Sequence, residues 1–376
     1  MRARDLGIQI GRMEPGPGNA ITDVAGVRVG HTTLIRGEGA LRAGEGPVRT
    51  GVTVIVPHDG DVWREPLFAG PHRLNGNGEL TGLEWIREHG MLAGAIGITN
   101  THSVGVVHDA LIEAGVRAHD MSDAIWALPV VGETYDGALN DINGFHVRPE
   151  HVFAALADAS DGRVSEGNVG GGTGMICHEF KGGIGTASRR AGEWSVGVLV
   201  QANYGSRDLL RIDGVPVGMA IPTSEVPSAW DQADAVSARA GAEGGSIIGI
   251  VATDAPLLPH QCARLAQRVG MGVARMGSFA SHGSGDLFLA FATGNRGLSH
   301  RAGEDDPRPT VELRMVVDEH INPLFEGVAE ATEEAIVNAL LAAETMTGRD
   351  GITAHALPVD RLLEVMGRHG RLAETR

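Results

Sequence analysis

The stretch GGSIIGIVATDAP, residues 244–256, decides the fold class of this 376-residue chain. Its composition changes within one residue from two glycines to a nearly continuous apolar run that begins at Ser246. A short apolar run rich in β-branched residues and followed by Pro is typical of a strand that is covered on both faces. The preceding residues, 223–245, contain few large apolar side chains and are predicted to form an exposed linker.

Strands and helices alternate on both sides of this stretch, and no internal repeat of fixed period is present. Strands are predicted over residues 26–34, 51–58, 91–99, 180–189, 193–205, 283–294 and 311–317. Helices are predicted over residues 80–90, 101–115, 151–159, 257–276, 318–346 and 357–369. Apolar runs without clean alternation indicate a layered α/β body whose strands are buried between other layers.

Composition excludes several classes of function. The formal charge of −16 disfavours a nucleic-acid partner, because most of the surface would repel phosphates. The chain has no run of about 18 apolar residues and no N-terminal apolar core of the signal-peptide type, so no membrane partner is expected. Two cysteines, Cys177 and Cys262, cannot form a disulfide framework and favour a reducing, cytoplasmic location. Lys181 is the only lysine and lies outside any phosphate-binding loop motif.

The junction between Gly245 and Ser246 is the strongest candidate for chemistry. A hydroxyl at the first residue of a buried strand, preceded by glycine, is what a self-cleaving precursor needs. Glycine permits a strained backbone and offers no Cβ to block attack of the Ser246 hydroxyl on the Gly245 carbonyl. Cleavage would make Ser246 a new N-terminus, whose α-amine, with an unperturbed pKa of about 8, can act as the base. The alternative is that Gly-Gly-Ser is simply a turn.

Three other segments carry polar groups next to predicted strands. Ser284 and Asp286 stand two residues apart, so on a strand they point to the same face and can relay a proton. Asn203 ends an apolar strand, where its carboxamide can donate to an oxyanion. Glu133 and Tyr135 follow another apolar run, where such groups commonly line a pocket. Turn or strand-capping roles remain the alternative for each of them.

Cofactor and metal motifs are not satisfied. GNVGGGTG, residues 167–174, has no register that fits G-x-G-x-x-G, so a dinucleotide-dependent oxidoreductase is disfavoured. The zinc motif H-E-x-x-H is absent, and the spacing of His102, His108 and His119 matches no recognised ligand pattern. No cofactor and no metal are expected.

Taken together, these segments resemble the self-processing family of L-aminopeptidase/D-amidase-esterases and β-peptidyl aminopeptidases. The matching stretches include ITDVAGVRVGHTT, LPVVGETYDGALNDI, VGVLVQANYG, GGSIIGIVATDAPLLPHQ and GSGDLFLAFATGN, and they span nearly the whole chain. The resemblance implies a four-layer αββα sandwich like that of N-terminal nucleophile (Ntn) hydrolases, with different connectivity. It also implies one domain over 1–376, cut into chains 1–245 and 246–376 that stay associated.

The resemblance further implies roles for the catalytic candidates. Ser246 matches the nucleophile that cleavage of the Gly245–Ser246 bond releases. Ser284 and Asp286 match the serine and the acidic residue that assist it, and Asn203 matches the oxyanion-stabilising asparagine. No metal takes part in such an acyl-enzyme mechanism.

The resemblance also implies the substrates and partners. Glu133 matches the carboxylate that receives the free amine of a small peptide, amide or ester, and Tyr135 belongs to the same pocket segment. The family implies a homotetramer or a larger oligomer. Two other functions remain open: an acyltransferase resembling the ornithine acetyltransferases, and an unprocessed, non-catalytic binding protein.

Overall fold

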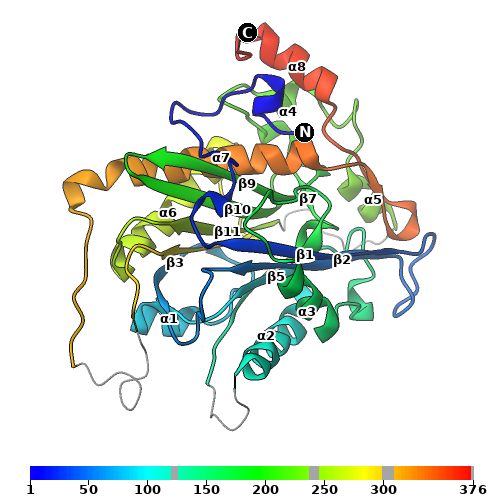
Figure 1. Cartoon of the computed structure of the whole chain (residues 1–376). Coiled ribbons are helices and arrows are strands. Elements are labelled where there is room, and N and C mark those ends of the chain that lie inside the picture. Colours follow the sequence, from blue (N-terminus) through cyan, green and yellow to red (C-terminus); the bar gives the residue numbers. More distant parts are fainter. Residues whose placement is uncertain (120–125, 237–244, 299–308, 374–376) are drawn as a thin grey trace.

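Two β-sheets stack face to face, and helices cover the outer face of each (Figure 1). The computed structural model describes residues 1–119, 126–236, 245–298 and 309–373. The larger sheet has six strands in the order β4-β3-β12-β11-β10-β9. The smaller sheet has four strands in the order β1-β2-β5-β6. This is the four-layer αββα arrangement that the family resemblance implied, and it agrees with the layered α/β body that the apolar patterns predicted.

The strands of the six-stranded sheet are β3 (Leu67–Gly76), β4 (Met91–Leu92), β9 (Gly183–Ala191), β10 (Trp194–Asn203), β11 (Ser246–Thr253) and β12 (Gly285–Ala292). The four-stranded sheet contains β1 (Arg28–Arg36), β2 (Val48–Val56), β5 (Ile96–Asn100) and β6 (Val130–Thr134). Two short hairpins stand apart from both sheets, namely β7 (Ile176–Cys177) with β8 (Phe180–Lys181) and β13 (Met346–Thr347) with β14 (Thr353–Ala354).

Two pairs of helices complete the layers. Helices α6 (Pro259–Arg275) and α7 (Asn322–Ala342) cover the six-stranded sheet, and α2 (Val104–Ala118) and α3 (Pro149–Asp158) cover the four-stranded sheet (Figure 1). The remaining helices are α1 (Leu83–His89), α4 (Val217–Ala220), α5 (Ala229–Val236) and α8 (Val359–Arg368).

Strand β11 shows why the apolar run at Ser246 lacks alternation. Ile247 and Val251 pack into the core beneath α6 and α7, whereas Ile248 and Ile250 pack into the core between the two sheets. Both faces are therefore apolar and buried, as the sequence indicated. The first residue of the strand, Ser246, is a polar exception at the edge of this core.

The Gly-rich passage at 167–174 has a structural explanation. Its 3-10 turn, Gly170–Gly172, packs against strands of both sheets. A Cβ on Gly171 would lie only 2.2 Å from Gln201 Oε1 and 2.6 Å from the Ile98 carbonyl oxygen. Glycine is required here because the backbone passes so close to its neighbours.

Two local expectations from the sequence were wrong, and one strand was missed. The segment 223–245 is not simply a linker, because α5 lies within it and buries Ala229 and Ala233 against Met346 and Ile352. Residues 311–317 are not a strand. Strand β3 was not predicted, and Pro71 within it makes the sequence look unlike a strand.

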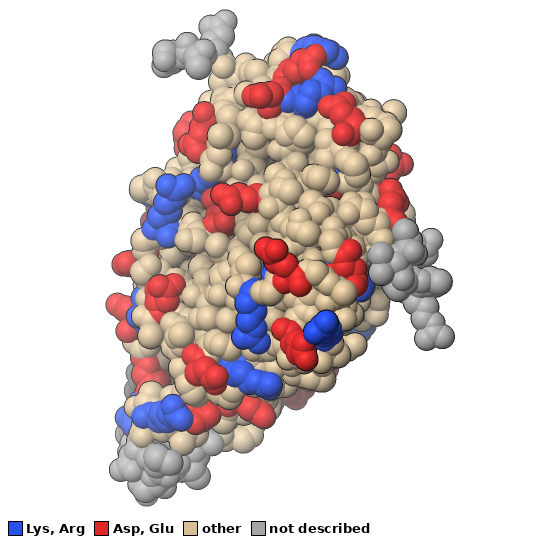
Figure 2. Space-filling view, turned by 90° about the vertical axis from the view of Figure 1, so that its right-hand side faces the viewer, with Lys and Arg blue, Asp and Glu red and all other residues tan. Residues whose placement is uncertain are grey.

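Surface charge and helix length complete the description. Acidic and basic side chains are interspersed over the face shown in Figure 2. Among the described helices, none combines the length and the apolarity that crossing a membrane requires.

Candidate active site

Ser246 lies where three segments of the six-stranded sheet meet. It is the first residue of β11, and it pairs with Asn203 at the end of antiparallel β10 and with Gly285 at the start of parallel β12. Its exposed fraction is 7%. Two of the sequence candidates, Asn203 and the Ser284–Asp286 pair, are thus placed on either side of the proposed nucleophile by strand pairing alone.

One backbone N–H contacts both oxygens of the Gly245–Ser246 junction. The Gly285 N–H donates to the Gly245 carbonyl oxygen at 3.1 Å and to Ser246 Oγ at 3.3 Å. A donor on a carbonyl oxygen stabilises the negative charge that develops there when a nucleophile attacks the carbonyl carbon. The sequence analysis did not find Gly285, since a backbone donor leaves no mark beyond its position between Ser284 and Asp286.

Gly245 is required for close packing at the junction. A Cβ at this position would lie 2.5 Å from Tyr204 Cα and 2.9 Å from the Asn203 carbonyl oxygen. Only glycine lets the junction lie this close to the end of β10.

Ser284 and Asp286 are in direct contact. Ser284 Oγ donates to Asp286 Oδ1 at 2.7 Å, and both residues are buried. Burial raises the pKa of Asp286 to about 6, although the hydrogen bond from Ser284 opposes the shift. Asp286 Oδ2 is buried without a hydrogen-bond partner among the described residues. The carboxyl group is therefore poised to exchange a proton near neutral pH.

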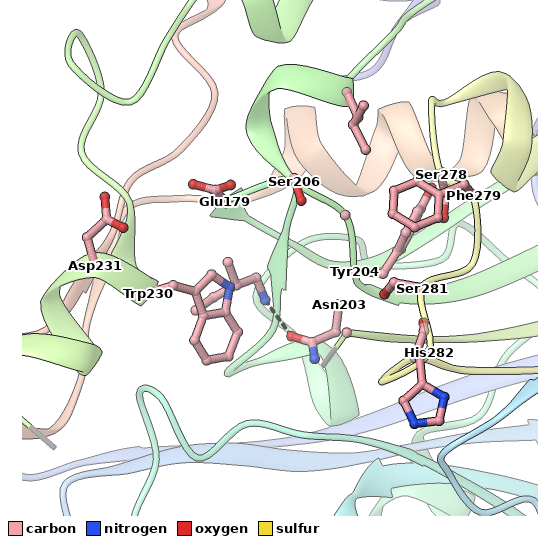
Figure 3. A pocket seen from close by; sticks show the side chains of 15 residues that line it. Glu179, Asn203, Tyr204, Ser206, Trp230, Asp231, Ser278, Phe279, Ser281 and His282 are labelled. Atoms are coloured by element: carbon pink, nitrogen blue, oxygen red, sulfur yellow. Dashed lines mark hydrogen bonds between the residues drawn. The ribbon is translucent and has the colours of Figure 1, made fainter. Parts of the chain in front are cut away.

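The Asn203 carboxamide has a fixed orientation. Its Oδ1 accepts the Ile176 N–H at 2.8 Å, the contact drawn as a dashed line in Figure 3, and its Nδ2 donates to the Tyr135 carbonyl oxygen at 3.1 Å. Because Ile176 N is a donor, the atom that faces it is the oxygen of the carboxamide. The amide NH2 is thereby held on the opposite side.

Glu133 is a buried carboxylate at the end of β6. It accepts hydrogen bonds from the Glu79 N–H at 3.0 Å and from the Thr101 hydroxyl, and burial raises its pKa. A Cβ on Gly78 would lie 3.1 Å from Glu133 Oε1 and 3.2 Å from Gly285 Cα, so Gly78 lies between the carboxylate and Gly285. Glu133, on the four-stranded sheet, is therefore close to the start of β12 on the six-stranded sheet.

Tyr135 reaches the site through its backbone. Its carbonyl oxygen accepts from Asn203, while its side chain is 41% exposed and folds back over Gly137. The sequence placed Tyr135 in the right segment, but its phenol makes no hydrogen bond with the other candidate residues.

A cavity of about 400 Å³ opens beside the junction (Figure 3). Asn203, Gly245 and Ser284 line it near the junction, and Trp230 and Asp231 of α5 line it further away. A cavity of this size accommodates a small ligand. Among the described residues, no group of three or more His, Cys, Asp or Glu side chains is arranged to hold a metal ion.

Comparison with known proteins shows similarity over almost the whole chain. Residues 19–354 match the model of a family described as peptidase family S58. The β-peptidyl aminopeptidase of Sphingosinicella microcystinivorans is 48% identical over 99% of this chain and 93% of its own. The structure of a Burkholderia sp. β-aminopeptidase has a TM-score of 0.89 and 53% identity, covering 98% of this chain and 99% of its own. The L-aminopeptidase D-Ala-esterase/amidase from Ochrobactrum anthropi has a TM-score of 0.87 and 43% identity, covering 99% of each chain, and is described as a prototype of the serine aminopeptidases with a new variant of the Ntn hydrolase fold.

Proposed function

This chain belongs to peptidase family S58 and is an aminopeptidase with an Ntn-type fold, and on this premise we propose that it cuts its own Gly245–Ser246 bond and then uses Ser246 as the nucleophile. The observation that carries this proposal is the single Gly285 N–H that contacts both Ser246 Oγ and the Gly245 carbonyl oxygen. Attack of Oγ on the Gly245 carbonyl carbon forms an ester as the peptide C–N bond breaks, and water then hydrolyses that ester. The products are chains 1–245 and 246–376.

Turnover follows from the new N-terminus. The Ser246 α-amine accepts the hydroxyl proton, and Oγ attacks the carbonyl carbon of the substrate. The Asn203 NH2 stabilises the oxyanion, and Ser284 with Asp286 orients the α-amine and relays its proton. The amine or alcohol leaves with a proton, and water releases the acid from the acyl-enzyme.

Glu133 determines which end of the substrate is cut. Its carboxylate pairs with the ammonium group of an N-terminal residue, which limits cleavage to the first bond of the substrate. We propose small peptides, amides and esters with a free amine as substrates. The names of the relatives add β-amino acid residues to this set, because two of the proteins compared above are called β-aminopeptidases or β-peptidyl aminopeptidases. Those names also favour hydrolysis over acyl transfer or binding without catalysis.

The cut chains are proposed to remain one domain in a cytoplasmic homotetramer or larger oligomer. Strands β11 and β12 of the second chain lie between β10 and β3 of the first chain, so cleavage leaves the sheet intact. Both cysteines are free and buried, which fits a reducing compartment.

Intact mass spectrometry combined with a substrate panel tests this function. The purified protein should resolve into 1–245 and 246–376, and Ser246→Ala should remain one chain without activity. The active form should release p-nitroaniline from L-alanyl, D-alanyl or β-homoalanyl p-nitroanilide, but not from the N-acetylated compounds. A full-length species that hydrolyses these substrates would contradict the mechanism.

A further inference from the structure

The β7–β8 hairpin is the nearest support of the Asn203 side chain. Its strands pair Ile176 with Lys181 and Cys177 with Phe180, leaving a two-residue turn at His178 and Glu179. Both turn residues have positive φ, 48° and 63°, although neither is glycine. Left-handed backbone at two such residues is unfavourable and persists only where the surroundings enforce it.

The hairpin is bonded to the end of β10 at two points. The Ile176 N–H donates to Asn203 Oδ1 at 2.8 Å, and the His178 N–H donates to the Tyr204 carbonyl oxygen at 2.6 Å. The first of these bonds sets the direction in which the Asn203 NH2 points. Any shift of the Ile176 peptide would therefore turn the carboxamide.

The only lysine of the chain binds this same peptide unit. Lys181 is fully buried, and its Nζ donates to the carbonyl oxygens of Met175 and Gly182, each at 2.8 Å, and of Gly172 at 3.4 Å. Met175 C=O and Ile176 N–H belong to one peptide bond. Burial lowers the pKa of Lys181 to about 7, and the neighbouring Cys177 opposes this shift.

The hydrogen-bond partners of Lys181 are unusual for a buried lysine, because all three are carbonyl oxygens. No carboxylate among the described residues forms a salt bridge with Lys181, whereas buried cations are normally paired with an acidic group. The hydrogen bond from Nζ to the Met175 carbonyl polarises the peptide group, which makes Ile176 N–H a stronger donor to Asn203.

We propose that Lys181 is a positioning residue, which holds the Met175–Ile176 peptide so that the Asn203 carboxamide points its NH2 at the oxyanion. The inference rests on the proposed role of Asn203 in turnover. It predicts that loss of the ammonium impairs the transition state more than substrate binding, since Glu133 and the cavity are left in place.

The first test compares Lys181→Met with Cys177→Ala, a matched change in the same hairpin. Lys181→Met should fold, because two of the carbonyl oxygens that lose Nζ still accept a backbone hydrogen bond. The Met175 carbonyl accepts the Gly182 N–H at 2.9 Å, and the Gly172 carbonyl accepts the Met175 N–H at 3.3 Å. We expect kcat, normalised to the cleaved fraction found by intact mass spectrometry, to fall about 10- to 100-fold, less than the roughly 100- to 1,000-fold cost of deleting an oxyanion donor. KM should change less than about twofold, and Cys177→Ala should keep wild-type kcat.

Lys181→Gln is the second variant, and it tests the same inference if Lys181→Met does not fold. It retains one donor for the Met175 carbonyl, so its kcat should lie between those of Lys181→Met and the wild type. A neutral variant that folds and has wild-type kcat would overturn the inference.

A double-mutant cycle with Asn203→Ala separates this inference from the proposed function. If Lys181 acts through Asn203, Lys181→Met should lower kcat little or not at all once Asn203 is already Ala. Equal losses in both backgrounds would overturn the positioning role and leave the oxyanion role of Asn203 standing. If Asn203→Ala alone keeps wild-type kcat, the oxyanion assignment itself is wrong, and the positioning role falls with it.

Discussion

Gly285 and Gly245 show how single residues at the junction act through their backbone. The Gly285 N–H is shared by Ser246 Oγ and the Gly245 carbonyl oxygen, and Gly245 has no room for a Cβ next to Tyr204. In the uncut chain the Asn203 NH2 is already bonded to the Tyr135 carbonyl oxygen. Gly285 N–H is the donor that already contacts the Gly245 carbonyl oxygen, whereas the bond to Tyr135 takes one of the two N–H donors of Asn203.

Gly245→Ala should slow self-cleavage. The new methyl group would lie 2.5 Å from Tyr204 Cα, so the junction must shift away from the end of β10, which disturbs its geometry at the Gly285 N–H. A displacement of about 1 Å at a reacting centre costs up to roughly 100-fold in rate. Denaturing electrophoresis over time measures the two products. Gly105→Ala is the control, because nothing lies within 4 Å of its Cβ position; cleavage of Gly245→Ala at the control's rate would contradict this view of the junction.

Glu133→Gln should separate the two activities that share Ser246. Gln keeps the volume but removes the charge, so a charge-assisted hydrogen bond worth about 1.5–3 kcal/mol is lost, equivalent to roughly 10- to 100-fold in kcat/KM. Self-cleavage should proceed normally, because the precursor presents no free amine there.

Glu79→Gln is the matched control for that prediction. The substitution keeps the backbone N–H that Glu79 donates to Glu133, and it removes a negative charge that raises the pKa of Glu133, so the Glu133 carboxylate remains ionised. Its kcat/KM should stay near the wild-type value. If Glu133→Gln is as active as this control, the ammonium must bind to another carboxylate.

The pH dependence of kcat should report Asp286 and the Ser246 α-amine separately. The α-amine must be neutral, which predicts a rise of kcat up to a pH of about 8. Asp286, whose pKa is raised to about 6, should add a second loss as the pH falls below 6 and the carboxylate that accepts from Ser284 is protonated. A pH profile of kcat measures both transitions. In the profile of Asp286→Asn, the transition near pH 6 should be absent, and the transition near pH 8 should remain.

Acid unfolding would not mimic the Asp286 transition. The folded pKa of about 6 lies above the unfolded value of about 3.9, so between these pH values the folded chain binds more protons. The contribution of Asp286 to folding stability therefore grows as the pH falls through this window. Unfolding midpoints recorded alongside kcat distinguish the two effects.

Among the elements, the sequence predicted those whose apolar pattern is set by burial on both faces. Strands β11 and β12 and helix α6 were found near their predicted positions because their side chains face two cores or one clear stripe. Residues 311–317 also alternate, but the backbone of Arg314 bonds to the Asn295 side chain and the Val316 N–H to the Pro256 carbonyl oxygen. These tertiary partners replace a strand ladder, and no local pattern reveals them.

The candidate site was predictable in part for the same reason. Ser246 was singled out as a hydroxyl that follows glycine at the start of a buried strand, and the contact between Ser284 and Asp286 was predictable because residues two apart on a strand point to the same face. The contribution of Gly285 and the burial of Lys181 could not be predicted, since both depend on which segments meet in space. For Lys181, the only signal in the sequence was an isolated lysine in FKGG.

The strained tip of the β7–β8 hairpin should depend on Arg207. Its guanidinium donates to the His178 carbonyl oxygen at 3.1 Å and to the Glu179 carbonyl oxygen at 2.8 Å, and lies 3.4 Å from the centre of the Phe180 ring. A lysine cannot span both carbonyls or stack in this way. We expect Arg207→Lys to lower the free energy of unfolding by about 1–3 kcal/mol in urea titrations. Arg361→Lys, in an exposed pair, should leave it nearly unchanged; equal effects would exclude a specific clamp.

At the scale of the whole molecule, cleavage would divide the chain inside its central sheet without exposing a new face. Buried ion pairs also cross between the two products. Arg189 of β9 is fully buried and contacts Glu330 at 3.0 Å and Glu334 at 2.7 Å, both on α7. Glu330 also accepts the backbone N–H groups of Arg12 and Met13. The first and second chains are thus joined by sheet pairing and by charge.

Arg189→Met should weaken this association without affecting the chemistry at Ser246. Removing one partner of a buried ion pair costs about 3–5 kcal/mol, because the carboxylates stay buried. The cost should fall near the lower limit, since Glu330 keeps its backbone donors and Glu334 keeps Arg4 at 3.0 Å. The cleaved variant should unfold at lower temperature than the wild type, while kcat measured well below that temperature stays the same. Arg12→Met is the control. It breaks the ion pair with Glu326, in which the Arg12 side chain is 81% exposed, and it should leave the unfolding temperature nearly unchanged. An Arg189→Met variant as stable as Arg12→Met would show that sheet pairing alone holds the two chains together.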